Sequence, residues 1–70
     1  MTRNLSLEIL RKGRHADDID VSADPDDVGT LRRTLRGWLE GNGWSEGRWG
    51  EFELLVRYEN EYKVRRKVRI

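Results

Sequence analysis

Four segments of the chain alternate between apolar and polar residues, which is typical of β-strands that bury one face. The alternation runs through residues 5–10, 18–23, 52–58 and 62–70. Gly13 lies between the first two segments and can adopt the positive φ of a tight turn at little cost. Residues 59–61 are expected to form the loop between the last two. The pattern therefore predicts a β-hairpin at each end of the chain.

The segment between the hairpins has helical periodicity. Asp24 is predicted as the N-cap and Pro25 as the first helical residue, where the missing N–H of proline costs nothing. The helix is expected to continue to about Glu40, and Gly41 is placed to end it. The apolar residues form one stripe that faces the core: Val28, Leu31, Leu35, Trp38 and Leu39.

The element order β-β-α-β-β predicts an α+β fold, with one helix packed on a four-stranded, mainly antiparallel sheet. A chain of 70 residues allows a single domain, residues 1–70, with a thin core. A β-grasp-like strand order would place the first and last strands side by side in the centre, and a simple meander is the alternative. Two free sheet edges fit a monomer or a weak homodimer.

Composition removes several function classes. The chain has no cysteine and a single histidine, His15, so neither a metal pair nor a nucleophile–base arrangement is present. We therefore expect a non-enzymatic protein without a cofactor or a metal. The absence of cysteine favours an intracellular protein. No apolar run approaches the ~20 residues of a membrane span, so we expect a cytoplasmic location and no membrane partner.

Charge is abundant but nearly balanced, with 39% charged residues and a net charge of +1. Basic residues alternate along the last segment, and period two places them on the side away from the helix: Lys63, Arg65, Lys67 and Arg69. They are candidate phosphate-binding residues for nucleic acid. The alternative is cross-strand pairing with the acidic residues that share this face: Glu8, Asp18, Asp20 and Glu53.

The aromatic residues of the last two strands argue against base stacking on this face. Phe52, Tyr58 and Tyr62 fall on the inward side of their strands. Arg66 also falls on the inward side. Either its side chain extends past the end of the helix to reach water, or a bulge turns it outward.

A glycine-rich connection at residues 41–50 carries Trp44, Arg48 and Trp49. Tryptophan and arginine are frequent at binding hot spots, so these three are candidate protein-binding residues, with Trp49 beside Arg48 as the anchor if its ring is exposed. The alternative, which we favour, is that both rings close the open end of a small core.

Two further charged groups have less specific interpretations. The arginines Arg32, Arg33 and Arg36 are expected on the exposed side of the helix, facing away from the basic strand, either as a solvated face, which we favour, or as a site for an acidic partner. Aspartates are concentrated between residues 17 and 27, but a calcium loop starting at Asp18 would place Ala23 where glycine is needed. Caps and solvated strand positions explain these aspartates better than a metal site. An acidic patch that imitates nucleic acid or docks on a basic protein is the other alternative.

The stretches Trp38–Trp44 and Arg48–Leu54 resemble small accessory proteins of actinobacteria and their phages. The resemblance covers roughly residues 35–57 and assigns no functional residue. Some phage accessory proteins act by binding and diverting a host protein, so the resemblance implies a small protein-binding module with a host protein as its partner. Nucleic-acid binding through the basic strand is the alternative function.

Overall fold

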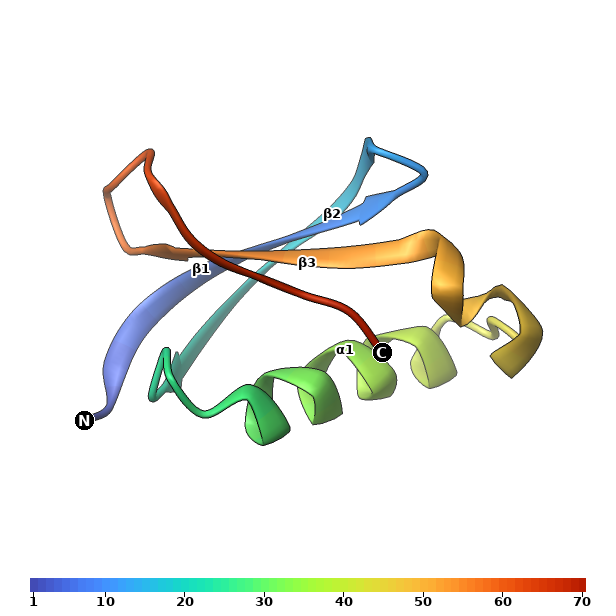
Figure 1. Ribbon diagram of the computed structural model, residues 1–70, viewed down its shortest axis with the longest axis horizontal. Coiled ribbons are helices and arrows are strands. Elements are labelled where there is room, and N and C mark those ends of the chain that lie inside the picture. The colour runs from blue at the N-terminus through green and yellow to red at the C-terminus, as the bar shows by residue number, and fades with distance from the viewer.

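The computed structural model describes residues 1–70 and has the predicted α+β fold. One helix lies across one face of a four-stranded antiparallel sheet, as Figure 1 shows. In chain order the elements are β1 (Arg3–Arg11), β2 (Arg14–Ala23), α1 (Val28–Gly41), the 3-10 helix η1 (Glu46–Glu51), β3 (Phe52–Tyr58) and β4 (Val64–Val68).

The strand order is β2-β1-β3-β4, which is neither of the two expected orders. The central strands are β1 and β3, not the first and last strands of a β-grasp, and β3 joins β1 rather than following β2 as in a meander. The reason is burial. Three inward residues in each of β1 and β3 are fully buried: Leu5, Leu7, Ile9, Phe52, Leu54 and Val56. In contrast, β2 and β4 carry more charge and tolerate the edges.

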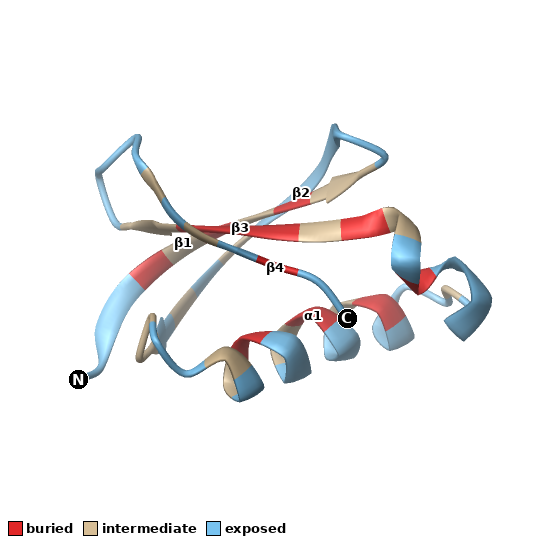
Figure 2. Cartoon of the chain, viewed as in Figure 1, coloured by how far each residue is buried: buried red, intermediate tan, exposed pale blue.

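The core lies between α1 and the two central strands. Leu31, Leu35 and Leu39 of the helix are fully buried. They belong to a cluster of 11 buried residues that also includes the inward residues of β1 and β3 and Val68 of β4. Figure 2 shows this as one buried stripe on the helix below the buried centre of the sheet. The outer strand β2 contributes only partly buried residues to the same core.

The helix begins later than the sequence pattern predicts. Asp24 is not its N-cap; instead, the Asp24 side chain accepts a hydrogen bond from the Asp26 N–H at 2.9 Å, and its carbonyl accepts one from the Asp27 N–H at 3.0 Å. Asp24-Pro25 therefore forms a turn, which aspartate and proline favour as strongly as a helix start. Asp27 is the N-cap, and its carboxylate accepts the Thr30 N–H at 3.1 Å.

The helix ends as a Schellman motif, one residue beyond the predicted stop. Asn42 is the C-cap, and Gly43 follows it with a φ of +78°. The Gly43 N–H donates to the carbonyl of Glu40, and the Trp44 N–H donates to that of Leu39. Gly43 thus has the backbone conformation that only glycine adopts cheaply, and it directs the chain into the tryptophan-containing connection.

Candidate functional site

The tryptophan connection closes the end of the core. Trp49, in η1, is only 8% exposed, and its Nε1–H donates to the carbonyl of Trp44 at 3.0 Å. The partly buried Trp44 ring meets the Phe52 ring in an edge-to-face contact, with centroids 5.0 Å apart. The interpretation that both rings plug the core is confirmed. The condition for a Trp49 anchor, an exposed ring, is not met.

Arg48 has a local role in the same region. Its Nη1 lies 3.3 Å from the carboxylate of Glu51. Arg11 binds the other oxygen of that carboxylate at 2.9 Å, and this hydrogen bond lowers the pKa of Glu51. The Arg11 guanidinium also lies 4.4 Å from the centre of the Trp44 ring. Arg11, Arg48 and Glu51 therefore form a polar cover over the aromatic end of the core.

The predicted basic stripe of the last strand is interrupted by a β-bulge. Pairing between β3 and β4 shifts after Val56, so Val56 is opposite Arg66 and Arg57 is opposite Val64, which leaves Arg65 without a partner residue. The Arg65 guanidinium lies over the Tyr58 ring at 4.5 Å and pairs with Glu61 at 3.0 Å. The prediction that Arg65 shares the outward face with its basic neighbours is therefore wrong.

The ends of the stripe also differ from the prediction. Lys63 and Tyr62 precede β4, and the Tyr62 side chain, expected on the inward side, is 98% exposed. Both positions lose strand geometry because β4 begins only at Val64. At the other end, Arg69 pairs with Glu53 at 3.1 Å. This contact is the cross-strand pair predicted for Glu53, whereas Glu8 pairs at 2.8 Å with Arg57 of β3 and not with the last segment.

Arg66 points toward the helix side of the sheet. Its Nε donates to the carbonyl of Pro25 at 3.1 Å, and its Nη2 lies 3.3 Å from the carboxylate of Asp26. The side chain thus extends past the start of the helix, the first of the two alternatives. It links the last strand to the turn that precedes α1.

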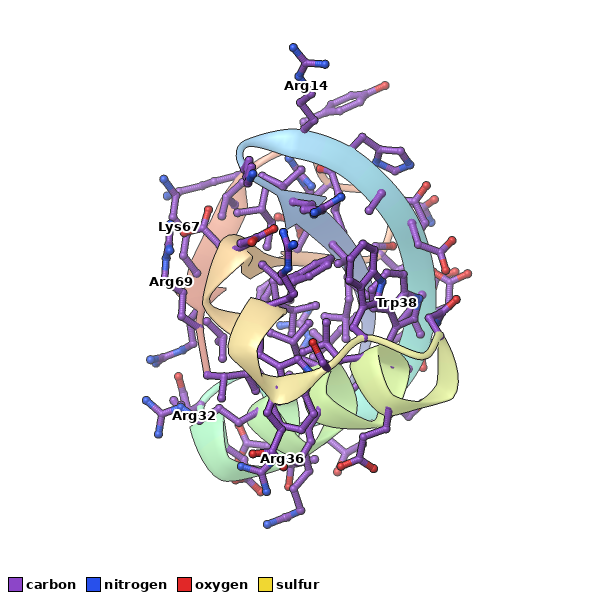
Figure 3. The ribbon with its side chains drawn as sticks, turned by 90° about the vertical axis from the view of Figure 1, so that its right-hand side faces the viewer. Arg14, Arg32, Arg36, Trp38, Lys67 and Arg69 are labelled. Atoms are coloured by element: carbon purple, nitrogen blue, oxygen red, sulfur yellow. The ribbon has the colours of Figure 1, made fainter.

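A group of exposed basic side chains, which we call the basic edge, extends from the helix to the outer side of β4. It consists of Arg32, Arg36, Lys67 and Arg69. Arg32 Nε donates to the backbone carbonyl of Arg69 at 3.2 Å, so the helix arginines and the last strand meet. Figure 3 shows Lys67, Arg69 and Arg32 along one side of the molecule, Arg36 at the bottom and Trp38 on the other side. The expectation that the helix and strand cations face opposite ways is therefore wrong for Arg32. Arg36, one turn further along the helix, lies over the Trp49 ring, 6.0 Å from its centre.

Most of the basic edge lacks an acidic partner within the chain. Only Arg69 forms a salt bridge, with Glu53, whereas Arg32, Arg36 and Lys67 form none. All members of the basic edge are exposed. The sequence alone did not reveal this surface because its two halves come together only through the strand order. The i,i+4 spacing of Arg32 and Arg36 was the available signal.

A second charged group lies on the open face of the sheet, at the hairpin of β1 and β2. His15 Nδ1 lies 2.9 Å from Glu8 Oε2, and its Nε2 lies 3.5 Å from the Asp18 carboxylate. The hydrogen bond with Glu8 raises the pKa of His15, and the hydrogen bonds from His15 and Arg57 lower the pKa of Glu8. The group therefore links β1 to the start of β2 through charged hydrogen bonds.

The aspartates between residues 17 and 27 are dispersed. Asp17 accepts the Trp38 Nε1–H at 2.8 Å, and this hydrogen bond lowers the pKa of Asp17. Asp24 and Asp27 accept backbone N–H groups at the turn and at the helix N-terminus. No group of three or more histidine, cysteine or acidic side chains is arranged to hold a metal ion. Most of these carboxylates thus have identifiable structural roles.

Comparisons with protein-family models, curated proteins and solved structures gave no match. The only long helix, α1, has neither the length nor the apolar character needed to cross a bilayer.

Proposed function

We propose that the protein is a small protein-binding module that uses the basic edge to bind an acidic surface of its partner. The observation that carries the proposal is the meeting of Arg32, Arg36, Lys67 and Arg69 along one side with a single internal salt bridge. Cations that the fold leaves unpaired are available to a partner. Arginine is also among the residues enriched at binding hot spots.

The distribution of charge favours a protein over a nucleic acid. The opposite edge strand, β2, carries Asp17, Asp18 and Asp20, and the whole chain has a net charge of only +1. A long polyanion experiences the field of the whole domain, whereas a compact acidic protein contacts only one side. In addition, the bulge removes Arg65 from the stripe on which the nucleic-acid alternative depends.

The resemblance to phage accessory proteins makes a host protein the first partner to test. The experiment is capture from an actinobacterial lysate by the immobilised protein, with and without nuclease. The test variant is Arg36→Glu with Lys67→Glu, because neither side chain forms a hydrogen bond or salt bridge within the chain. The control variant is Arg14→Glu with Lys63→Glu, which makes the same charge change at exposed positions outside the basic edge.

We expect one host protein to be retained by the wild type and the control after nuclease treatment, and to be lost from the test variant. Binding should weaken as salt rises, since the contact is between charges. Material that disappears with nuclease would overturn the proposal in favour of nucleic-acid binding. Equal retention by both variants would show that the basic edge is not the binding surface.

A further inference from the structure

The long edge strand β2 has an unpaired side. It spans ten residues, lies at the end of the sheet and pairs only with β1. From Asp17 to Ala23 its register with β1 is uninterrupted. In an antiparallel strand, alternate residues direct both their N–H and C=O groups away from the paired neighbour. This part of β2 therefore presents a regular row of backbone donors and acceptors at the rim of the sheet.

The other free edge does not offer such a row. β4 has only five residues, and the bulge at Arg65 disrupts its pairing. Arg32 already occupies the carbonyl of Arg69, just beyond the end of β4. Short strands and bulges are devices that prevent edge pairing, and β4 has both. Between Asp17 and Ala23, β2 has neither.

The helix side of β2 offers apolar contacts to an additional strand. Ile19, Val21 and Ala23 point toward the helix layer but are only partly buried. Figure 2 shows β2 without the buried stretches that mark β1 and β3. Trp38 of the helix is also partly buried, and its Nε1–H donates to Asp17. A strand placed beside β2 would cover these apolar side chains.

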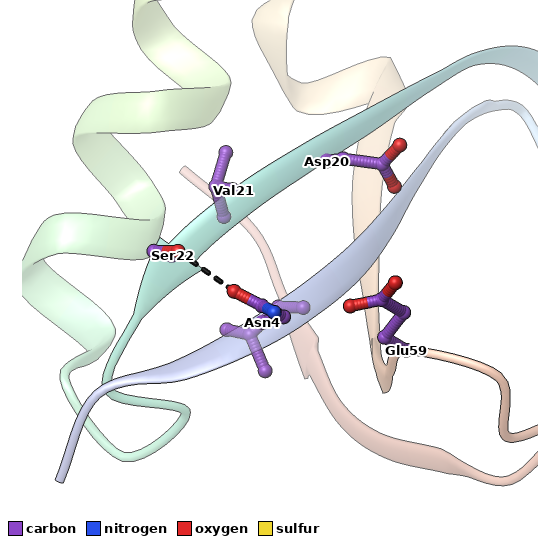
Figure 4. Close-up of a pocket in the computed structure, with 6 residues that line it drawn as sticks. Asn4, Asp20, Val21, Ser22 and Glu59 are labelled. Atoms are coloured by element: carbon purple, nitrogen blue, oxygen red, sulfur yellow. Dashed lines mark hydrogen bonds between the residues drawn. The ribbon is translucent and has the colours of Figure 1, made fainter.

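The open side of β2 is acidic. Asp20 borders a shallow hollow of about 220 Å³ together with Asn4, Ser22 and Glu59, shown in Figure 4. Asp18 and Asp20 also border a smaller hollow of about 150 Å³. Asp20 has no cationic partner, and Asp18 has only His15 at 3.5 Å. These carboxylates alternate with Ile19 and Val21, so the two sides of β2 require different side chains from a neighbouring strand.

We infer that residues 17–23 of β2 bind an extended segment of a partner protein in which basic and apolar residues alternate. The segment adds a fifth strand, as in β-augmentation. Its apolar side chains cover Ile19 and Val21, and its lysines or arginines lie beside Asp18 and Asp20. This binding surface is separate from the basic edge and does not depend on it.

The chain itself is a poor occupant of this edge. A second copy could offer its own β2, but the aspartates of the two strands would then face like charges. Its β4 is basic but short and bulged. The like charges of a second β2 and the irregular pairing of β4 therefore favour a different protein as the source of the added strand.

The test uses a short synthetic peptide of alternating lysine and valine, added to the isotopically labelled full chain and followed by NMR. We expect the amide signals of residues 17–23 to shift and their hydrogen exchange to slow. A peptide of alternating glutamate and valine should not bind. Every second amide of the lysine peptide can be N-methylated in two ways, starting from odd or from even positions. One of these two phases removes the N–H donors that face β2, and that peptide should lose binding because strand addition needs those donors.

The matching protein variant is Asp18→Lys with Asp20→Lys, for which we expect at least about tenfold weaker binding. Glu40→Lys with Glu46→Lys makes the same charge change away from β2 and should bind as the wild type does. Equal binding of the two N-methylated peptides would show that charge attraction alone causes the binding, and it would overturn the inference. So would shifts at the basic edge instead of β2, or concentration-dependent self-association through β2 without peptide.

Discussion

Apolar side chains are enclosed at the aromatic end of the core but remain partly exposed at the β2 edge. At the aromatic end, the chain turns back after α1, and η1 places Trp49 in the core and Trp44 against Phe52. At the β2 edge, no segment returns, and Ile19, Val21 and Ala23 remain partly buried. The glycine-rich connection has the composition of a binding loop, yet its aromatic residues close the core. In contrast, β2 has the ordinary alternation of a half-buried strand, yet it leaves apolar surface available to a partner.

The largest expected effect is at the aromatic end. Trp49→Ala removes an 8% exposed ring together with its hydrogen bond to Trp44. We expect a loss of about 3–5 kcal/mol in the free energy of unfolding. A domain of this size has only a few kcal/mol to lose, so the variant should be largely unfolded by far-ultraviolet circular dichroism.

The matched change at the β2 edge is Val21→Ala, which shortens a partly buried side chain of the same core. Here the expected loss is about 1 kcal/mol, measured by urea denaturation. Similar losses of unfolding free energy at both positions would show that side chains at the β2 edge are as tightly packed as those at the aromatic end. That result would contradict the difference between the two regions.

An effect smaller than that of Trp49→Ala distinguishes the glycines within the tryptophan connection. Gly43 has a φ of +78°, whereas Gly47 has no positive φ, and a Cβ there would meet nothing within 4 Å. Gly43→Ala should cost about 1–2 kcal/mol because an L-residue is strained in that conformation. Gly47→Ala should be neutral or stabilising by about 0.5 kcal/mol, since it restricts the unfolded chain. Equal effects in thermal unfolding would contradict the assignment of Gly43 as the residue that ends α1.

The difference between the two regions also shows what the sequence could predict. Alternation located the strands and the stripe of α1, because burial of one face imposes those periods. The strand order depends on which strands bury most surface, and a simple pattern count does not rank them. Asp24-Pro25 satisfied both a turn and a helix start, so the N-cap was placed three residues early.

Two residues of the last segment were misplaced because β4 is irregular and starts late. The bulge at Arg65 and the late start of β4 change the faces of Arg65 and Tyr62, and a strict period of two cannot represent an extra residue. The basic edge was missed for a different reason. Its members are far apart in the chain, and only the contact between Arg32 and Arg69 joins them.

The smallest effect concerns pH and acts on the start of β2 alone. His15 faces Glu8, Asp17 and Asp18, and the hydrogen bond with Glu8 raises its pKa above the ordinary value of 6.5. The folded protein therefore holds the proton more tightly than the unfolded chain. The resulting stabilisation is fully present below pH 6.5 and is lost as the pH rises through the raised pKa.

We expect the melting temperature of the wild type to exceed that of His15→Gln at acidic pH, with the difference shrinking as the pH rises above 6.5. An NMR titration should place the pKa of His15 above 6.5 in the wild type and nearer that value in Glu8→Gln, which lacks the carboxylate. Val21→Ala and Trp49→Ala leave this contact intact, so neither change should alter the pH dependence. A His15 pKa at or below 6.5 in the folded protein would show that Glu8 does not hold the ring, and that the open face of β2 is less ordered than the aromatic end.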